Sequence, residues 1–201
     1  MLDYLIEAFS GPGSAFMYAI TALMAFALAV GLERAFLLLL RWRVDTKAVA
    51  SKLQDPQAAA EAAGATPLGN VLRAGAAESD AEAAWDAMGA ATAAAEARLS
   101  NRVDYVGTIA NMATMLGLLG TVYGLMLAFS GLGDASAGQR AVRLSEGIST
   151  AMATTAFGLV VGIPALGLHA WLSALVRRRV AEIEVLAGQL VVVLRRKASA
   201  D

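Results

Sequence analysis

The chain has 201 residues, of which 58% are hydrophobic and 16% are charged, with a formal net charge of -1. This composition is too apolar for an ordinary soluble domain, and the charge gives no sign of nucleic-acid binding. The sequence holds no cysteine and a single histidine, His169, so it lacks thiolate and zinc sites and the usual members of a catalytic triad. We therefore expect no enzyme, no metal site and no cofactor.

The first element is an apolar run at residues 14–40, long enough to cross a bilayer, which takes about 20 helical residues. Residues 1–13 before it contain carboxylates but no Lys or Arg, unlike the basic start of a signal peptide. These features predict a retained first transmembrane helix. Glu33 and Arg34 lie near its end, either as an interfacial pair or as a functional one.

Residues 41–104 are more polar and predict a helical domain outside the membrane. From Asp80 to Asn101 the segment is rich in alanine, and no helix-breaking signal interrupts it before the next span. We therefore expect one helix of about 50 residues that runs into that span. A loop is expected before it, punctuated by Gly64, Pro67 and Gly75.

The second predicted span, residues 105–129, contains no charged residue. Small and hydroxylated residues recur on one helical face at spacings of three and four: Ala110, Thr114, Gly117, Thr121, Gly124 and Ala128. The pair Gly120 and Gly124 adds a GxxxG motif, which allows close approach of two helices. A short loop at residues 130–146 follows.

The third predicted span, residues 147–176, has a comparable face formed by Ala151, Thr155, Gly158 and Gly162. Pro164 is expected to kink or loosen this helix. His169 is expected at the membrane interface, with a proton-relay role as the alternative. The C-terminal segment, residues 177–201, continues the helix with an apolar stripe that should pack on a neighbour: Val180, Ile183, Leu186, Leu190 and Val193.

Basic residues are unevenly distributed at the ends of the spans, and the 130–146 loop offers only Arg140 and Arg143, so this asymmetry predicts the orientation. Basic residues follow the first span, precede the second and close the third, at Arg41, Arg43, Lys47, Lys52, Arg98, Arg102, Arg177, Arg178 and Arg179. By the positive-inside rule the N-terminus and the 130–146 loop lie outside. Residues 41–104 and the C-terminus are then cytoplasmic, so the second and third helices extend into the cytoplasm.

From spacing alone, the two small-residue faces have two possible functions. Such faces usually mediate helix packing, and a threonine in a span often only bonds the carbonyl four residues earlier. The alternative is a polar conduit. Ion transfer across a membrane normally uses an intramembrane carboxylate, and the second and third spans have none in their middle. A conduit would therefore need an acid from a partner subunit.

Four segments together resemble the MotA/TolQ/ExbB proton channel family, specifically its short three-span ExbB/TolQ branch. Residues 116–124, LGLLGTVYG, are similar to the family's LLGLLGTVxG signature. Residues 147–165 resemble its GIxxALxTTAxGLxVAIPA signature. Glu33-Arg34 and residues 67–75 match further family features in the same order along the chain.

The resemblance implies a homo-pentamer in the bacterial inner membrane that encloses the single spans of an ExbD/TolR-like dimer. That partner would supply one membrane aspartate per chain, and a TonB/TolA-like protein could receive the mechanical work. Family members place hydroxyls matching Thr121 and Thr155 near the aspartate, so we assign these two to the ion pathway. Further pore-lining candidates are Thr150, Thr154, Ser149 and Thr114; the packing candidates are Gly117, Gly120, Gly124, Gly158, Gly162 and Pro164.

The sequence departs from the family pattern at three places. Thr114 stands where many members have proline, and Thr150 stands where a glutamate is typical. His169-Ala170 replaces a common Tyr-Asn pair. A hydroxyl-rich site also suits Na⁺, so the translocated ion is expected to be H⁺ with Na⁺ as the alternative. The expected function is the stator ring of an ion-driven envelope motor, and the alternative is a non-conducting membrane scaffold.

Overall fold

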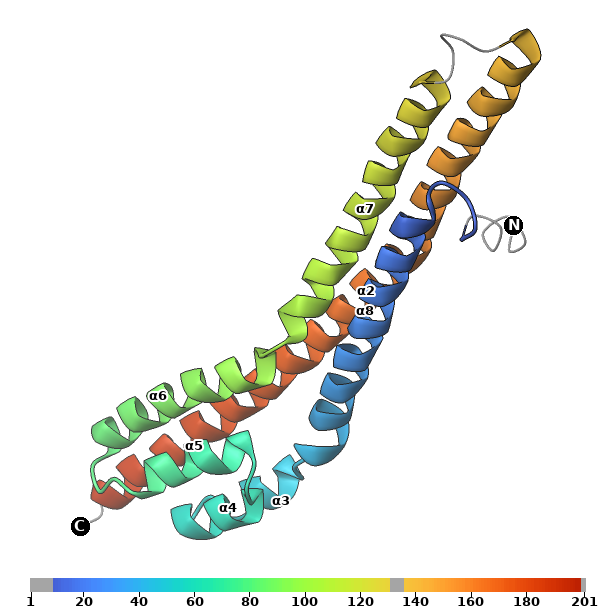
Figure 1. Ribbon diagram of the computed structural model, residues 1–201. Coiled ribbons are helices and arrows are strands. Elements are labelled where there is room, and N and C mark those ends of the chain that lie inside the picture. Colours follow the sequence, from blue (N-terminus) through green and yellow to red (C-terminus); the bar gives the residue numbers. More distant parts are fainter. Residues whose placement is uncertain (1–8, 131–135, 200–201) are drawn as a thin grey trace. The chain divides into compact units, whose positions relative to one another are not determined.

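The computed structural model describes residues 9–130 and 136–199, and every regular element among them is a helix (Figure 1). Three helical stretches are long and apolar enough to cross a membrane: Ser14–Arg41, Ala81–Ser130 and Gly138–Ala198. The predicted all-α class with three apolar helices is therefore confirmed. Parts of the predicted N-terminal segment and of the 130–146 loop lie outside the described residues.

The chain forms two compact units, each built from two separate stretches of sequence. Unit 1 comprises Met1–Leu32 and Arg102–Ala170. Unit 2 comprises Glu33–Asn101 and Trp171–Asp201.

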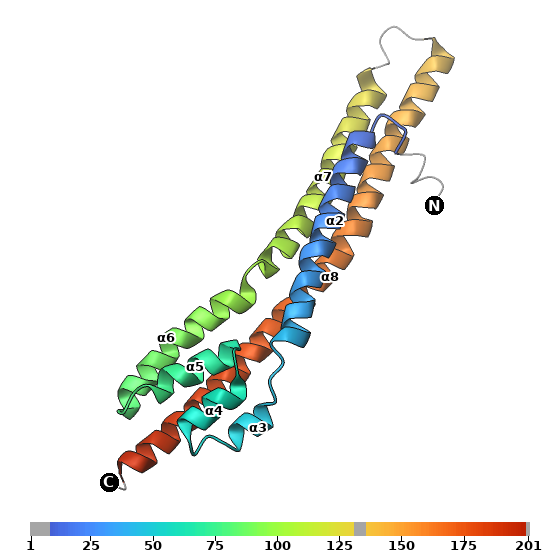
Figure 2. The same ribbon diagram turned by 60° about the horizontal axis from the view of Figure 1, so that its bottom comes forward.

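Unit 1 is a packed set of three helices: most of α2 (Ser14–Phe36), all of α7 (Val103–Ser130) and the first part of α8 (Ala137–Ala198). The views in Figures 1 and 2 both show these helices side by side. One buried residue from each helix, Ile20, Ala113 and Val161, forms their common core. The first turns of α2 add ring contacts, since Phe16 lies 5.4 Å from Tyr123 between ring centroids.

The helix α7 buries its small residues and exposes its large ones. Its buried positions include Ala113, Gly117, Gly120, Gly124 and Ala128. Met115, Met126 and Phe129 are in contrast 63–66% exposed. This pattern is the reverse of a soluble helix and is expected in lipid, where helices associate by close packing rather than by burying large apolar side chains.

The predicted continuous helix from Asp80 through the second span is wrong, because α6 (Ala81–Ser100) and α7 are separate helices. Asn101 is extended, and Arg102 has a left-handed backbone with φ of 65°. Leu99 is buried in unit 2 and Val103 is buried in unit 1. The two sides of the break are thus anchored in different units, which explains an interruption that no Gly or Pro announces.

The third predicted span belongs to one uninterrupted helix of 62 residues, α8, which includes the C-terminal segment as expected. Its start differs from the prediction, because residues 137–146 are helical rather than part of a loop. Ser136 and Gln139 stabilise this earlier helix start. The Gln139 side-chain oxygen accepts hydrogen bonds from the Ser136 amide and hydroxyl, both at 3.2 Å. The bond from the Ser136 amide to the Gln139 side chain is one of the two reciprocal bonds of a capping box.

In unit 2 each short helix begins with a side chain that caps it. The helices are α3 (Thr46–Ala50), α4 (Pro56–Ala63), α5 (Pro67–Ala76) and α6, and their caps are Asp45, Asp55, Thr66 and Asp80. Each cap oxygen accepts hydrogen bonds from free amides of the first turn. A π-helical turn, η1 (Leu37–Arg41), directly follows α2.

The predicted loop between Gly64 and Gly75 is also wrong, because α5 occupies most of it. Gly64 ends α4 with φ of 63°, and Pro67 stands at the start of α5, where a missing amide costs nothing. Gly75 lies inside α5, and a β-carbon there would lie 2.5 Å from the Met88 sulfur of α6. Gly75 therefore allows α5 and α6 to pack closely rather than marking a turn.

The core of unit 2 consists of large apolar side chains. Leu72 of α5, Leu99 of α6 and Leu190 of α8 are almost fully buried. On the predicted C-terminal stripe, Ile183 and Leu186 are also buried at 4% exposure. This part of α8 packs by side chains, as its pattern predicts.

Candidate functional site

Within unit 1, α7 and α8 approach each other backbone to backbone at paired glycines. A β-carbon on Gly117 would lie 3.0 Å from the Thr154 carbonyl oxygen and 3.2 Å from the Gly158 Cα. At Gly124 it would lie 2.6 Å from both the Ala151 amide nitrogen and the Gly147 carbonyl oxygen. Since neither contact involves a flexible side chain, a β-carbon at Gly124 would force the helices apart, and one at Gly117 would require a small shift between them.

Thr155 crosses this contact with a hydrogen bond to the other helix. Its hydroxyl donates to the Gly117 carbonyl oxygen at 3.2 Å, across 38 residues of sequence. In the helical pattern of α7, the amide of Thr121 donates to the same carbonyl, because it lies four residues on. The Thr155 side chain therefore reaches the turn of α7 that precedes Thr121.

The hydroxyl protons of both threonines are used by carbonyl groups. Thr121 donates to the Leu118 carbonyl at 2.5 Å, and Thr155 donates to Gly117. A carbonyl oxygen can only accept, so the hydroxyl is the donor in each pair. What the two side chains offer to a third group is then oxygen lone pairs, which suit a cation or a proton donor.

Two other candidate hydroxyls lie in contacts inside the unit. Thr154 is 1% exposed and donates to the Thr150 and Ala151 carbonyls at 3.0 and 3.1 Å. A β-carbon on Gly120 would overlap its side chain. Thr150 is buried as well, with its methyl group 2.8 Å from a β-carbon placed on Gly13. In the isolated chain these two threonines fill the spaces beside glycines.

The last two candidate hydroxyls lie at more open positions. Thr114 is half-buried, donates to the Ala110 carbonyl at 3.1 Å and lies directly against Gly162. Ser149 is half-buried in α8. The pore-lining role assigned to these residues and to Thr150 and Thr154 stays a prediction.

Pro164 does not interrupt α8. A proline has no amide hydrogen, so the Val160 carbonyl, four residues earlier, lacks its usual helical donor.

His169 lies against the first turns of α7, a contact that sequence reasoning missed. Its Nδ1 lies 3.1 Å from the Val103 carbonyl oxygen, so that nitrogen carries the proton. The ring also lies 3.0–3.1 Å from where a β-carbon of Gly107 would stand. The residues are 66 positions apart in sequence, and only the absence of a side chain at Gly107 hints at the contact.

Arg34 of the predicted charged pair is 6% exposed, and Glu33 Oε1 lies 3.7 Å from its Nη2. Its Nε is buried without a hydrogen-bond partner among the described residues.

Over residues 9–130 and 136–199, no three His, Cys, Asp or Glu side chains gather as they would around a metal ion.

These features define a class: a helical membrane protein with three transmembrane helices, whose second and third helices touch at glycines and carry hydroxyls. Residues 63–185, more than half of the chain, match the MotA/TolQ/ExbB proton channel family. The chain belongs to this family, as its motifs indicate.

Several relatives support this membership. The chain is 33% identical over 94 residues to the biopolymer transport protein ExbB of Aquifex aeolicus, covering 47% of this chain and 63% of the relative. It is 41% identical over 69 residues to the Tol-Pal system protein TolQ of Haemophilus influenzae, covering 34% and 29%. With ExbB of Pseudomonas putida it shares 36% over 77 residues, covering 38% and 23%. The chain thus matches less than two thirds of each relative.

Proposed function

We propose that the chain is the ring-forming subunit of an ion-driven motor in the bacterial inner membrane. In this proposal a homo-pentamer surrounds the spans of an ExbD/TolR-like dimer, whose membrane aspartate carries the ion. The motor would power envelope work such as TonB-dependent transport or Tol-type envelope maintenance. The names of the relatives, biopolymer transport and the Tol-Pal system, support this direction.

The observation that carries the proposal is the Thr155 hydroxyl, which donates to the Gly117 carbonyl of α7, while the Thr121 hydroxyl on the same helix donates to the Leu118 carbonyl. Two hydroxyls with unused lone pairs lie in spans that contain no carboxylate of their own. Lone pairs accept a hydrogen bond from a protonated carboxyl or bind a passing cation. The site therefore fits one half of an ion-transfer pair, with the acid on the partner.

The exposed apolar side chains of α7 support a ring. Large residues such as Met115 and Met126 face away from the unit, where lipid or a neighbouring copy would cover them. The orientation in the proposal keeps the N-terminus periplasmic and the C-terminus cytoplasmic, following the distribution of arginines.

The test is ion flux in vesicles that contain this chain together with an ExbD/TolR-like single-span protein. Flux driven by a proton gradient, and absent without the partner, is expected. Flux that continues with the proton gradient collapsed and a sodium gradient imposed would instead select Na⁺ as the ion.

The second candidate is a non-conducting scaffold, favoured by the backbone-close packing at Gly117 and Gly124. That arrangement alone is sufficient for assembly. The scaffold predicts stable complexes with the partner but no flux under either gradient.

A further inference from the structure

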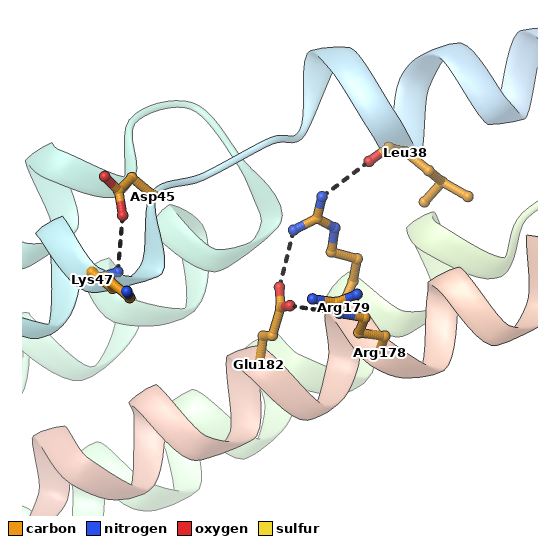
Figure 3. Close-up of polar contacts among 6 residues, drawn as sticks. All are labelled: Leu38, Asp45, Lys47, Arg178, Arg179 and Glu182. Atoms are coloured by element: carbon orange, nitrogen blue, oxygen red, sulfur yellow. Dashed lines mark hydrogen bonds and ion pairs between the residues drawn. The ribbon is translucent and has the colours of Figure 1, made fainter.

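Two segments that carry arginines meet within unit 2. Arg179 of α8 donates through one terminal nitrogen to the Leu38 carbonyl of η1 at 3.5 Å, and through the other to Glu182 Oε2 at 3.0 Å (Figure 3). Trp42, which ends η1, lines a small pocket together with Arg179 and Ile183. The end of the first apolar helix thus lies beside the turn of α8 that begins at Arg177.

The two contacting segments together contain five arginines, which we call the arginine cluster: Arg41, Arg43, Arg177, Arg178 and Arg179. The same two segments, residues 37–45 and 177–184, hold only three carboxylates, Asp45, Glu182 and Glu184. Glu182 pairs with Arg178 at 3.2 Å and with Arg179 (Figure 3). The cluster therefore keeps an excess of positive charge, and Arg41, Arg43 and Arg177 are exposed.

The cluster lies where two apolar helices leave the membrane. The first apolar stretch ends at Arg41, and the uncharged run of α8 ends immediately before Arg177. Trp42 and Trp171 flank the same ends, and tryptophan is enriched at the level of lipid head groups. At this level the nearest abundant anions are the phosphates of the adjoining leaflet.

We propose that the arginine cluster binds the head group of an anionic phospholipid. Arg41, Arg43 and Arg177 supply the donors, because a guanidinium presents paired N–H groups that match two phosphate oxygens. Arg179 holds η1 beside α8 and so keeps the two segments that carry these arginines together. The proposal is independent of ion conduction and concerns a different part of the chain from Thr121 and Thr155.

The experiment compares two triple variants of equal charge. The test variant is Arg41→Gln, Arg43→Gln and Arg177→Gln. The control is Arg195→Gln, Arg196→Gln and Lys197→Gln, at the exposed end of the same helix α8. Each protein is reconstituted in vesicles of equal parts phosphatidylglycerol and phosphatidylcholine, extracted in mild detergent, and its retained lipid is quantified.

Wild-type protein and control are expected to retain phosphatidylglycerol in preference to phosphatidylcholine. Each basic residue near an anionic surface contributes about fivefold to the preference, so the loss of three should reduce it by about tenfold or more. The proposal is overturned if the wild type shows no preference, or if the test variant keeps the preference of the control.

A measurement on wild-type protein keeps the test decisive should the triple variant not fold. Raising the salt concentration is expected to reduce the retained phosphatidylglycerol, since exposed charges are screened. Inorganic phosphate at the same concentration as the lipid is expected not to displace it. Retention that is independent of salt, or displacement by free phosphate, would contradict a lipid site.

Discussion

The helix α8 is packed in two opposite ways along its length. In unit 1 it contacts α7 through Gly158 and Gly147, where even a β-carbon would meet backbone atoms. In unit 2 the same helix buries large side chains such as Leu186 and Leu190. Small residues thus make the contact in one unit and large ones in the other.

The proposed topology, with unit 1 in the bilayer and unit 2 in water, accounts for the difference. In water, burying apolar surface stabilises a fold by about 25 cal/mol per Å². In lipid that gain is absent, so helices associate through close contact and hydrogen bonds. The Thr155–Gly117 bond and the glycine contacts of unit 1 have this character, whereas unit 2 has aspartate caps, ion pairs and a leucine-rich core.

Removing a large core side chain from unit 2 should have the largest effect on stability. Leu190→Ala deletes a fully buried side chain and should lower the free energy of unfolding by about 3 kcal/mol. The control, Val192→Ala, changes a side chain on the same helix that is 49% exposed. Thermal unfolding followed by circular dichroism measures both. Equal midpoints for the two variants would contradict the core assigned to unit 2.

Adding a single methyl group to unit 1 should have the next largest effect. Gly124→Ala forces a β-carbon against the backbone of α8 and should cost about 2 kcal/mol. Gly167→Ala is the matched control, because a β-carbon there meets nothing within 4 Å. Resistance of the purified protein to denaturation in detergent distinguishes them. If Gly167→Ala were the more damaging change, the assigned α7–α8 contact would be incorrect.

A smaller effect is expected at the caps of unit 2. Asp80 accepts the amides of Glu82 and Ala83 at 3.0 and 2.9 Å, so Asp80→Ala should cost about 1 kcal/mol. Asp86→Ala, within the same helix, should be neutral or slightly stabilising because alanine favours helix. Hydrogen exchange of the first turn of α6 provides the measurement. Unchanged protection in Asp80→Ala would exclude a capping role.

Much of the fold is readable from the sequence, because long uncharged runs and residue spacing depend only on local pattern. The three apolar helices and the buried stripe containing Ile183 and Leu190 follow in this way. Two helices that lie in predicted loops also have local sequence signals. A Ser-x-x-Gln motif marks the helix start at Ser136, and a Thr-Pro pair marks the helix that begins at Pro67. The break at Arg102 had none, since it depends on burial on both sides.

The candidate site was predictable only in part. Helical spacing placed Thr121 with Gly117, and Thr155 with Gly158, on shared faces. The hydrogen bond between Thr155 and Gly117 depends on the axial register of α8 against α7. Local sequence patterns do not determine this register for two residues that are 38 positions apart. The same holds for His169 and Val103. Such a register is determined by the closest glycine contacts, and these appear only once the helices are paired.

The central claim is that Thr155 lies on an ion pathway, and the variant that tests it should change stability least. Thr155→Val removes one membrane hydrogen bond, worth about 0.6 kcal/mol, and leaves the packing volume nearly unchanged. Thr155→Ser keeps the hydroxyl and serves as the control. Ion flux is measured in vesicles containing each variant with its single-span partner, after assembly is verified by mass. We predict that valine abolishes flux while serine retains it; full flux through the assembled valine variant would contradict an ion pathway at Thr155.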